Sequence, residues 1–360
     1  MLKIGLVGCG RISKKHIEAI AANEDICELV AVADLIPAKM ETAAAMYNKK
    51  TGKQPRKYMD YKDMLKITDL DIIAIATESG YHAEHALASL EAGKHVLVEK
   101  PMALSTSDCN KMIASAEEKG LALGLCHQNR FNPPVQKLRQ ALQKDKLGRV
   151  LSGTACIRWN RNQDYYNQAP WRGTWAMDGG TLMNQCLHNI DLLQWMLGEE
   201  AVTVFAQTGN YLRDIEAEDF GAIVIRFANG AIGIVEGSAC VYPANLEETL
   251  NIFGETGTVC IGGLAVNKIE VWNVPGEDLI DNSNQPDPDT VYGAGHIPLY
   301  KDFVKAVQEE RKPYIDGRAG KKAVEIILAA YKSQLTGLPV AMPLMNFSTL
   351  DMREANLKQR

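Results

Sequence analysis

The sequence lacks any uninterrupted apolar run of about 18 residues, the minimum length for a membrane-spanning helix. Its amino terminus leads directly into a strand-like segment and shows no signal-peptide pattern. These two absences predict a cytoplasmic protein with no membrane partner.

An excess of basic residues is also missing. Lys and Arg number 39 against 44 Asp and Glu, which gives a formal net charge of -5. Because nucleic-acid binding needs a concentrated basic surface, we expect no nucleic-acid partner. The eight cysteines form no C-x-x-C pair and mostly stand in apolar runs, so they predict buried reduced thiols rather than disulfides or a zinc site.

A chain of 360 residues with 46% apolar residues has enough material for two domains. Strands and helices alternate through residues 1–128, which predicts an α/β Rossmann domain with a doubly wound sheet. Residues 129–360 contain many strand-like segments and few helices. They predict an α+β domain with a large, mostly antiparallel open sheet for substrate binding and oligomerisation, with a C-terminal helix packing back on the first domain.

The first βαβ unit, residues 3–34, carries a glycine-rich turn between a strand and a helix. Gly8 permits the turn and Gly10 allows backbone N–H groups to approach a pyrophosphate at the helix start, next to Arg11 and Ile12. Asp34 closes the second strand, where a carboxylate accepts ribose hydroxyls and repels the 2′-phosphate of NADP. The pattern therefore predicts NAD as the cofactor.

Ligands of doubly wound sheets bind at the carboxyl ends of the strands. We therefore expect further cofactor contacts from residues at or just beyond those ends, namely Thr77, His82, Glu99, Lys100 and Gln128. His82 and His85 are three residues apart on a predicted helix, but no third ligand stands nearby, so we predict no metal.

Lys100 ends the apolar segment Gly93–Pro101 and immediately precedes a proline. The residue before a proline is held in extended geometry and cannot begin a helix. Lys100 is therefore placed at the end of its strand, where it is a candidate catalytic group. A solvated lysine without function is the plainer alternative.

The most polar and aromatic part of the chain lies between residues 158 and 175. Arginines there suit a diphosphate or a carboxylate, and aromatic rings suit a sugar face. We name Arg158, Arg161, Tyr165 and Arg172 as candidate substrate contacts. An irregular surface loop with buried tryptophans is the alternative.

A helical pattern follows the double glycine at 179–180. Asn184, His188 and Asp191 stand at i, i+4 and i+7, which places them on one helix face. His188 is a candidate catalytic group, with Asn184 and Asp191 as candidate substrate contacts. Such a histidine by itself is more often a buried core residue.

The Glu-Lys-Pro motif, the Gly-Cys-Gly-Arg-Ile turn and the Gly-Gly-x-Leu-x-Asn-x-x-x-His-x-x-Asp pattern resemble the Gfo/Idh/MocA oxidoreductase family across nearly the whole chain. In that family a lysine and a histidine at the positions of Lys100 and His188 face the substrate. The histidine follows an aspartate by four residues, whereas Asn184 stands there here. A neutral amide hydrogen-bonds a hydroxyl but carries no proton.

Further motifs, Arg-Trp-x-Arg-x-x-x-Tyr-Tyr and Trp-Arg-Gly-Thr-Trp, resemble the UDP-N-acetylglucosamine and UDP-N-acetylglucosaminuronate 3-dehydrogenases. This resemblance implies oxidation of the C3 hydroxyl of a UDP-sugar for surface-polysaccharide synthesis. It also implies 2-oxoglutarate as an oxidant that recycles the cofactor in some relatives, and a homotetramer; an open sheet by itself favours a homodimer or a homotetramer.

Two other functions fit the sequence. One is an NAD-dependent dehydrogenase for inositol or a free sugar, although such relatives usually keep aspartate where Asn184 stands. The other is a catalytically silent NAD sensor, which should have lost Lys100 or His188. Either Lys100 or His188 can serve as the base in a dehydrogenase, and the sequence leaves that choice open.

Overall fold

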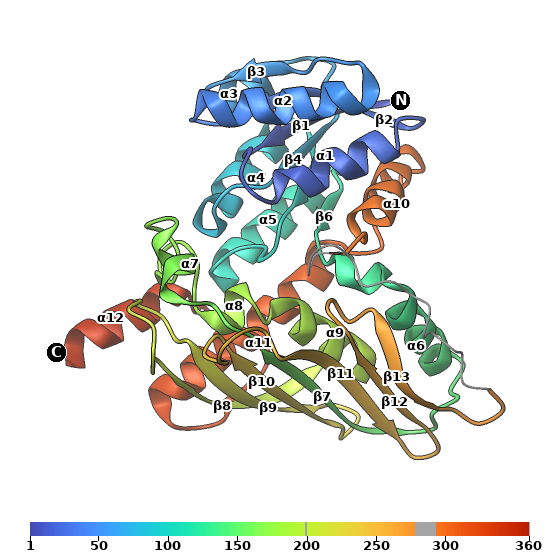
Figure 1. Ribbon diagram of the computed structural model, residues 1–360, viewed down its shortest axis with the longest axis vertical. Helices are drawn as coiled ribbons and strands as arrows, with labels where there is room; N and C mark the ends of the chain where they lie inside the picture. Colours follow the sequence, from blue (N-terminus) through green and yellow to red (C-terminus); the bar gives the residue numbers. More distant parts are fainter. Residues whose placement is uncertain (199, 278–292, 360) are drawn as a thin grey trace. The chain divides into compact units, whose positions relative to one another are not determined.

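The computed structural model describes residues 1–198, 200–277 and 293–359 (Figure 1). These residues divide into two compact units. The first comprises residues 1–103, 107–128 and 295–321, and the second comprises residues 104–106, 129–294 and 322–360. In the described parts of the chain, no helix combines the length and the apolar character needed to cross a membrane.

The first unit contains a six-stranded parallel sheet in the order β3-β2-β1-β4-β5-β6. Strands buried on both faces need continuous apolar runs, and β4 is buried at every position. The bounds are β1 Leu2–Val7, β2 Cys27–Ala33, β3 Arg56–Tyr58, β4 Ile72–Ile75, β5 His95–Val98 and β6 Leu123–Leu125.

Helices connect these parallel strands, as a doubly wound sheet requires. They are α1 Ser13–Ala22, α2 Pro37–Thr51, α3 Tyr61–Leu65, α4 His82–Glu91 and α5 Thr106–Glu118. Helix α10, His296–Gln308, joins this unit from much later in the chain and packs against α1. The first unit thus needs residues 295–321 in addition to the amino-terminal segment predicted from sequence.

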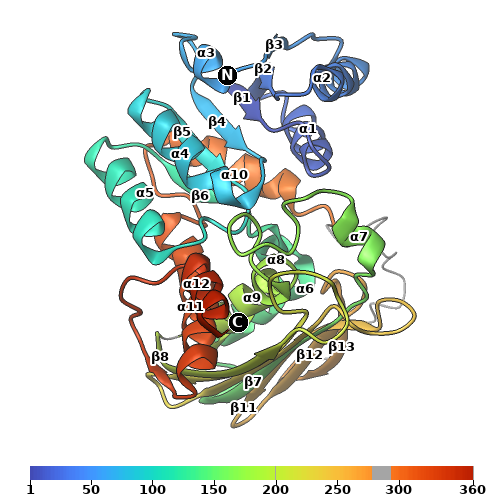
Figure 2. The ribbon, with the colours of Figure 1, turned by 90° about the vertical axis from the view of Figure 1, so that its left-hand side faces the viewer.

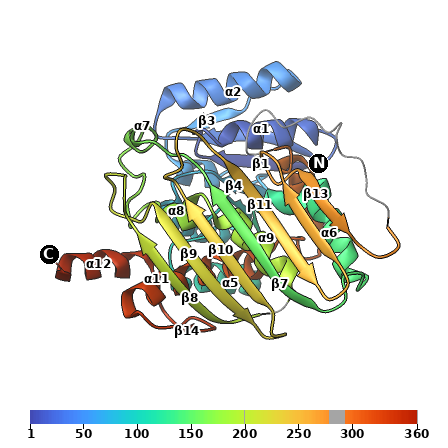
Figure 3. The same ribbon diagram turned by 60° about the horizontal axis from the view of Figure 1, so that its bottom comes forward.

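The second unit contains an eight-stranded sheet in the order β13-β12-β11-β7-β10-β9-β8-β14 (Figure 3). All neighbours pair antiparallel except β7 and β10, which are parallel. The bounds are β7 Val150–Arg158, β8 Ala201–Gly209, β9 Phe220–Phe227, β10 Ile232–Ser238, β11 Glu247–Gly254, β12 Thr258–Gly262, β13 Lys268–Asn273 and β14 Val340–Ala341.

Helices α8, Thr181–Asn184, and α9, Leu187–Leu197, lie against one face of this sheet (Figure 2). Glycines on the strands allow the close approach. A Cβ atom on Gly221 would lie 2.7 Å from Leu182, and one on Gly237 would lie 2.5 Å from the sulfur of Cys186. These contacts fix the start of α9 directly over the sheet. The other helices are α6 Pro133–Gln143, α7 Gln163–Asn167, α11 Gly317–Thr336 and α12 Thr349–Gln359.

The opposite face of the sheet keeps several large apolar side chains exposed. Phe205 on β8 pairs with Val224 on β9, which pairs with Ile234 on β10. Their exposed fractions are 36%, 48% and 46%. The three side chains form a row across neighbouring strands, which we call the outer row.

Candidate active site

The glycine turn after β1 has the geometry of a pyrophosphate cradle. Gly8 has φ +92°, and a Cβ there would lie 2.6 Å from the backbone of Ala76, so only glycine fits. A Cβ on Gly10, by contrast, would meet no atom within 4 Å. Helix α1 then begins after Ile12 with no side-chain cap, which leaves its amino terminus open to an anion. Arg11 is exposed at this turn.

Asp34 is held in place at the end of β2. Its Oδ2 accepts the Cys9 N–H at 2.8 Å, and its Oδ1 accepts the Ile36 N–H at 2.8 Å. The carboxylate is half-buried and keeps lone pairs for further donors. Ser13, which occupies the usual third small position, is buried and donates its hydroxyl to the Gly10 carbonyl at 2.6 Å. The serine therefore closes the turn.

Lys100 follows β5 and is half-exposed between two buried neighbours, Glu99 and Pro101. The peptide bond to Pro101 is cis. The carboxylate of Glu99 accepts the Lys100 N–H at 3.1 Å through Oε2. The lysine backbone is thus anchored to a buried group while the side chain leaves the core.

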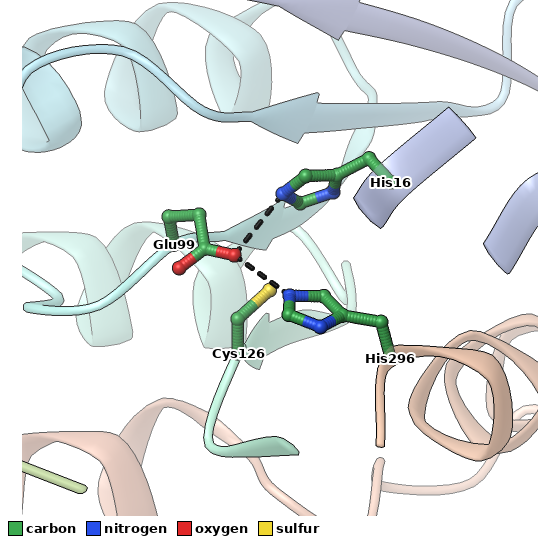
Figure 4. Close-up of side chains that lie close together, drawn as sticks. All are labelled: His16, Glu99, Cys126 and His296. Atoms are coloured by element: carbon green, nitrogen blue, oxygen red, sulfur yellow. Dashed lines mark hydrogen bonds and ion pairs between the residues drawn. The ribbon is translucent and has the colours of Figure 1, made fainter. Parts of the chain in front are cut away.

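Glu99 is the centre of a buried hydrogen-bonded network in the first unit (Figure 4). Its Oε1 lies 3.1 Å from His16 Nε2 and 3.0 Å from His296 Nε2. Tyr300 completes the network with its hydroxyl 2.6 Å from His16 Nδ1. Burial alone would raise the pKa of Glu99, but the bonds from His16 and His296 lower that pKa well below its usual range.

Cys126 adds its sulfur to this group, so two histidines, a carboxylate and a thiol lie within 4.8 Å of one another. The donor set is one that zinc accepts. Both Nε2 atoms, however, lie at hydrogen-bond distance from Glu99, and burial followed by the Glu99 charge raises the pKa of the thiol well above its usual range. A hydrogen-bonded network accounts for this geometry, and the cofactor contact of Glu99 stays a prediction.

His82, a further predicted cofactor contact, lies between two backbone carbonyls, and its cofactor contact stays a prediction. It is 1% exposed, and its Nδ1 lies 2.7 Å from the Pro101 carbonyl and its Nε2 3.1 Å from that of Thr77. The ring joins the ends of β4 and β5. Thr77 itself is half-buried, with its hydroxyl 3.1 Å from His85 Nδ1, and Gln128 is buried at the start of a short 3-10 helix.

In the second unit, residues 181–194 across α8 and α9 include two half-exposed residues among buried ones. Between residues 181 and 194, only Asn184 and His188 are not buried. Gln185 and Cys186 keep right-handed helical dihedrals, so the spacing of four residues places Asn184 and His188 on one face. The fold therefore directs these two predicted site residues away from the sheet.

A polar cluster surrounds Asn184. Gln185 donates from Nε2 to Asn184 Oδ1 at 2.8 Å and to the Tyr165 hydroxyl at 3.0 Å, and it accepts Arg161 Nε at 3.0 Å. Arg172 donates to the same hydroxyl at 2.6 Å. The guanidinium carbons of Arg161 and Arg172 lie 5.4 and 4.4 Å from the Tyr165 ring centre. Two cations therefore converge on one tyrosine beside Asn184.

Two predicted substrate contacts, Arg158 and Asp191, form ion pairs within the second unit. Arg158 lies on the sheet face opposite to the buried Ala155 and Ile157, and its guanidinium is held by Glu236 and Glu247 on the neighbouring strands. Those carboxylates occupy the donors that an anionic substrate would need.

Asp191 is 1% exposed and forms a two-pronged ion pair with Arg130 at 2.7 and 2.6 Å. Its carboxylate stabilises a buried arginine and has no surface for a substrate. The helix face predicted from the i, i+4, i+7 spacing therefore ends at His188.

Two residues of the polar cluster around Asn184 were not predicted from the sequence. Gln185 links Asn184 to the arginines, and Asp178 accepts the Asn184 side-chain amide. The only sequence indication was their position around the double glycine 179–180. The turn there needs glycine because Gly179 has φ +75° and a Cβ on Gly180 would lie 1.3 Å from Glu218 Oε2.

Comparison with known families agrees with this architecture. Residues 2–127 match the model of the oxidoreductase family with an NAD-binding Rossmann fold, and residues 135–260 match the GFO/IDH/MocA C-terminal domain. The chain belongs to the Gfo/Idh/MocA family.

Relatives of different specificity occur within Gfo/Idh/MocA. The chain is 37% identical to the WlbA dehydrogenase of Bordetella pertussis, solved with NADH and UDP-GlcNAcA, with a TM-score of 0.85 and coverage of 96% of this chain and 99% of that one. It is 26% identical to the myo-inositol 2-dehydrogenase of Thermotoga maritima over 92% of this chain and 96% of that protein. The inositol 2-dehydrogenase of Rhizobium meliloti is 27% identical with the same coverage.

The first unit is the NAD-binding domain of this family member. The open space beside Gly10 and the uncapped start of α1 fit the pyrophosphate, and the Asp34 carboxylate fits the ribose hydroxyls. The two residues that follow Asp34 are Leu35 and Ile36, which are apolar and exposed. No basic side chain therefore follows Asp34 directly.

Proposed function

We propose that the protein oxidises the C3 hydroxyl of a UDP-N-acetyl-hexosamine, with UDP-N-acetylglucosaminuronate as the favoured substrate. The observation that carries this proposal is the pair of arginines, Arg161 and Arg172, converging on Tyr165 beside Asn184. The likeness to a dehydrogenase solved with UDP-GlcNAcA supports it. The product would be a 3-keto sugar for surface-polysaccharide synthesis in the cytoplasm.

Binding of this substrate requires recognition of negative charge. A guanidinium offers planar, paired donors that match a carboxylate or a diphosphate. We assign this task to Arg161 and Arg172, with the Tyr165 ring beside them as a surface for a sugar or base. Asn184 is half-exposed and can hydrogen-bond a sugar hydroxyl.

Oxidation of a secondary alcohol removes a proton from oxygen and a hydride from carbon. NAD supplies the hydride acceptor. We assign proton removal to His188 and stabilisation of the developing negative charge on oxygen to Lys100. The reverse assignment, with Lys100 as the base, predicts a different pH profile.

The direct test is to incubate purified protein with NAD and a panel of UDP-sugars and to follow reduced nicotinamide. The panel is run with and without 2-oxoglutarate, because an enzyme that retains its cofactor needs this oxidant to turn over. Reduction with UDP-N-acetylglucosaminuronate above all other sugars is the expected result. Absence of reduction in both conditions, with NAD binding demonstrated, would contradict the proposal.

The catalytic roles are tested with Lys100→Met and His188→Asn. Each loss of a general base or an oxyanion donor should lower kcat by about 100-fold or more. The variant that abolishes the acidic limb of the pH–rate profile identifies the base. Near-wild-type turnover in both variants would remove both assignments.

A second candidate is oxidation of inositol or a free sugar, favoured by the nearly full-length similarity to inositol dehydrogenases. The two candidates differ in their need for the arginines. For a UDP-sugar, Arg172→Gln should raise KM by about 10-fold or more, because it removes a charge-assisted contact. For a neutral polyol the same change should leave KM nearly constant.

We also propose that the outer row is buried between copies of this chain, as a homodimer or homotetramer. Exposed apolar side chains on adjacent strands are typical of a protein interface. Val224→Lys should lower the oligomeric state in light scattering, whereas Arg226→Lys on the same face serves as the matched control. A monomeric wild-type protein would contradict this proposal.

A further inference from the structure

We propose that Asp178 is a positioning residue of the active site, which fixes the direction of the Asn184 amide and polarises it. This inference rests on the proposed function. It is drawn from the contacts of a buried carboxylate that takes no part in the reaction described above.

Asp178 lies at the entrance to the double-glycine turn and is 2% exposed. Its Oδ2 accepts the Gly173 N–H at 2.7 Å, and its Oδ1 accepts the Nδ2 of Asn184. The side chain is therefore fixed at both oxygens from within the second unit. Because it is buried, we assign its influence on a substrate to its contact with Asn184.

The chemistry of these groups sets one direction for the amide. An ionised carboxylate only accepts hydrogen bonds, so the Nδ2 of Asn184 must face Asp178. The Oδ1 then faces Gln185 and accepts its Nε2 at 2.8 Å. Gln185 in turn presents Oε1 to Arg161. Reversing the Asn184 amide would place its NH2 group against the Gln185 NH2 group.

The negative charge of Asp178 also strengthens this chain of bonds. A hydrogen bond to an ionised group is roughly twice as strong as a neutral one, and it increases the electron density on the opposite end of the amide. Asn184 Oδ1 thereby becomes a better acceptor on the face that also carries His188. The Asp178 carboxylate thus influences the site through the side chain of Asn184.

A second buried acid stands next to this pair. Glu218 accepts the Leu182 N–H at 2.8 Å and the Tyr331 hydroxyl at 3.1 Å. Burial, with a smaller contribution from Asp178, raises the pKa of Glu218 to about 8. Glu218 is therefore mainly neutral at pH 7, and we assign the charge at this turn to Asp178.

The test is a double-mutant cycle with Asp178→Asn, Asn184→Asp and both together. Asp178→Asn keeps the shape but removes the charge, and Asn184→Asp places two carboxylates in contact. Each single change should lower kcat by about 10-fold, with the affinity for NAD unchanged. The double variant restores one acid and one amide in exchanged positions, so its kcat should return to within about 3-fold of wild type.

Asp214→Asn serves as the matched control, since Asp214 is an exposed carboxylate of the same unit. It should keep wild-type kcat. A wild-type kcat in Asp178→Asn, or a double variant whose losses multiply to about 100-fold, would overturn the inference.

A readout without substrate separates this inference from the proposed function. In nitrogen-15 NMR spectra, the Asn184 side-chain amide, assigned by its disappearance in Asn184→Asp, should exchange slowly with water and shift on Asp178→Asn but not on Asp214→Asn. If wild-type protein oxidises no sugar yet shows this behaviour, the proposed function fails and the positioning of Asn184 stands. An amide unaffected by Asp178→Asn would overturn the positioning in any case.

Discussion

Glu99 in the first unit and Glu218 in the second are both buried carboxylates, with exposed fractions of 5% and 3%, yet their pKa values move in opposite directions. Glu99 faces two imidazole Nε2 atoms, and its pKa lies well below the usual range. Glu218 faces one backbone N–H, one tyrosine hydroxyl and a neighbouring carboxylate, and burial raises its pKa to about 8. The partners, rather than burial, decide which form the protein holds.

The largest change in stability should follow from Glu99→Gln. In the wild type Oε1 accepts from both histidines and Oε2 accepts the Lys100 N–H, whereas an amide keeps only one acceptor oxygen. Its NH2 group must therefore face donors on one of the two sides, and the charge that the histidines face is lost, so we expect a loss of about 3 to 5 kcal/mol in the free energy of unfolding. Urea denaturation at pH 7 measures it. Glu24→Gln, at an exposed position of the same unit, should change stability little.

The pH dependence of this difference has a defined sign. The pKa of Glu99 is lower in the folded state than in the unfolded chain, so its contribution is present above the unfolded pKa and is lost as pH falls below it. The stability curves of wild type and Glu99→Gln should therefore converge in acid. Curves that stay parallel down to pH 3 would show that Glu99 is not ionised in the folded protein.

The next largest effect should come from Gly180→Ala in the second unit. The added methyl group would lie 1.3 Å from Glu218 Oε2, so the acid must move from its site. We expect a loss of about 3 kcal/mol from overpacking, measured by urea denaturation. Gly10→Ala, where a Cβ meets nothing within 4 Å, should leave the stability of the cofactor-free protein nearly unchanged.

Glu218→Gln should change the free energy of unfolding by a smaller amount and in the opposite direction, so that the variant gains stability. Because the folded pKa is raised, the stabilisation from Glu218 is complete below its unfolded pKa of about 4.3 and is lost as pH rises to about 8. Glutamine is neutral throughout, so the variant should become progressively more stable than wild type as pH rises toward 8.

Thermal unfolding between pH 5 and pH 8 checks this prediction, since the difference between the proteins should grow over that window. Glu248, a second buried acid whose pKa burial raises to about 8, is present in both proteins and cancels in the difference. A variant less stable than wild type at pH 8 would show that Glu218 is already ionised.

The smallest effects should come from the two tyrosines that complete these environments. Tyr300→Phe removes the partner of His16 Nδ1, and Tyr331→Phe removes a donor to Glu218. Each should cost about 1 kcal/mol in the free energy of unfolding. The Tyr331 hydroxyl lowers the pKa of Glu218, so Tyr331→Phe should in addition raise that pKa further. The stability difference that Glu218→Gln produces should then grow over a higher pH range.

Local features of the chain were predictable from sequence. The parallel sheet with its glycine turn follows from apolar runs separated by Gly8, Gly10 and Asp34, because each of these features depends on neighbours in the chain. Seven strands of the second sheet were visible in the strand pattern, whereas the two-residue β14, Val340–Ala341, was not. The edge strand β3, Arg56–Tyr58, was missed because three polar residues form no apolar pattern.

Features that depend on distant partners were not predictable. Asp191 shares a helix spacing with His188, but its partner Arg130 lies 61 residues earlier. Arg158 looked available for an anion, but the strands that supply Glu236 and Glu247 lie 78 and 89 residues later. Glu218 was not predicted for the same reason, since it contacts the double-glycine turn but lies 38 residues after Gly180 in the chain.

The late joining of residues 295–321 to the first unit has a consequence for synthesis on the ribosome. His296 and Tyr300 emerge only after nearly all strands of the second unit, so the nascent first unit holds Glu99 without two members of its network. Until then an acid destined for the interior has His16 but neither His296 nor Tyr300, and the NAD-binding unit cannot reach its final stability. Folding of the amino-terminal unit is thereby coupled to the synthesis of residues 295–321.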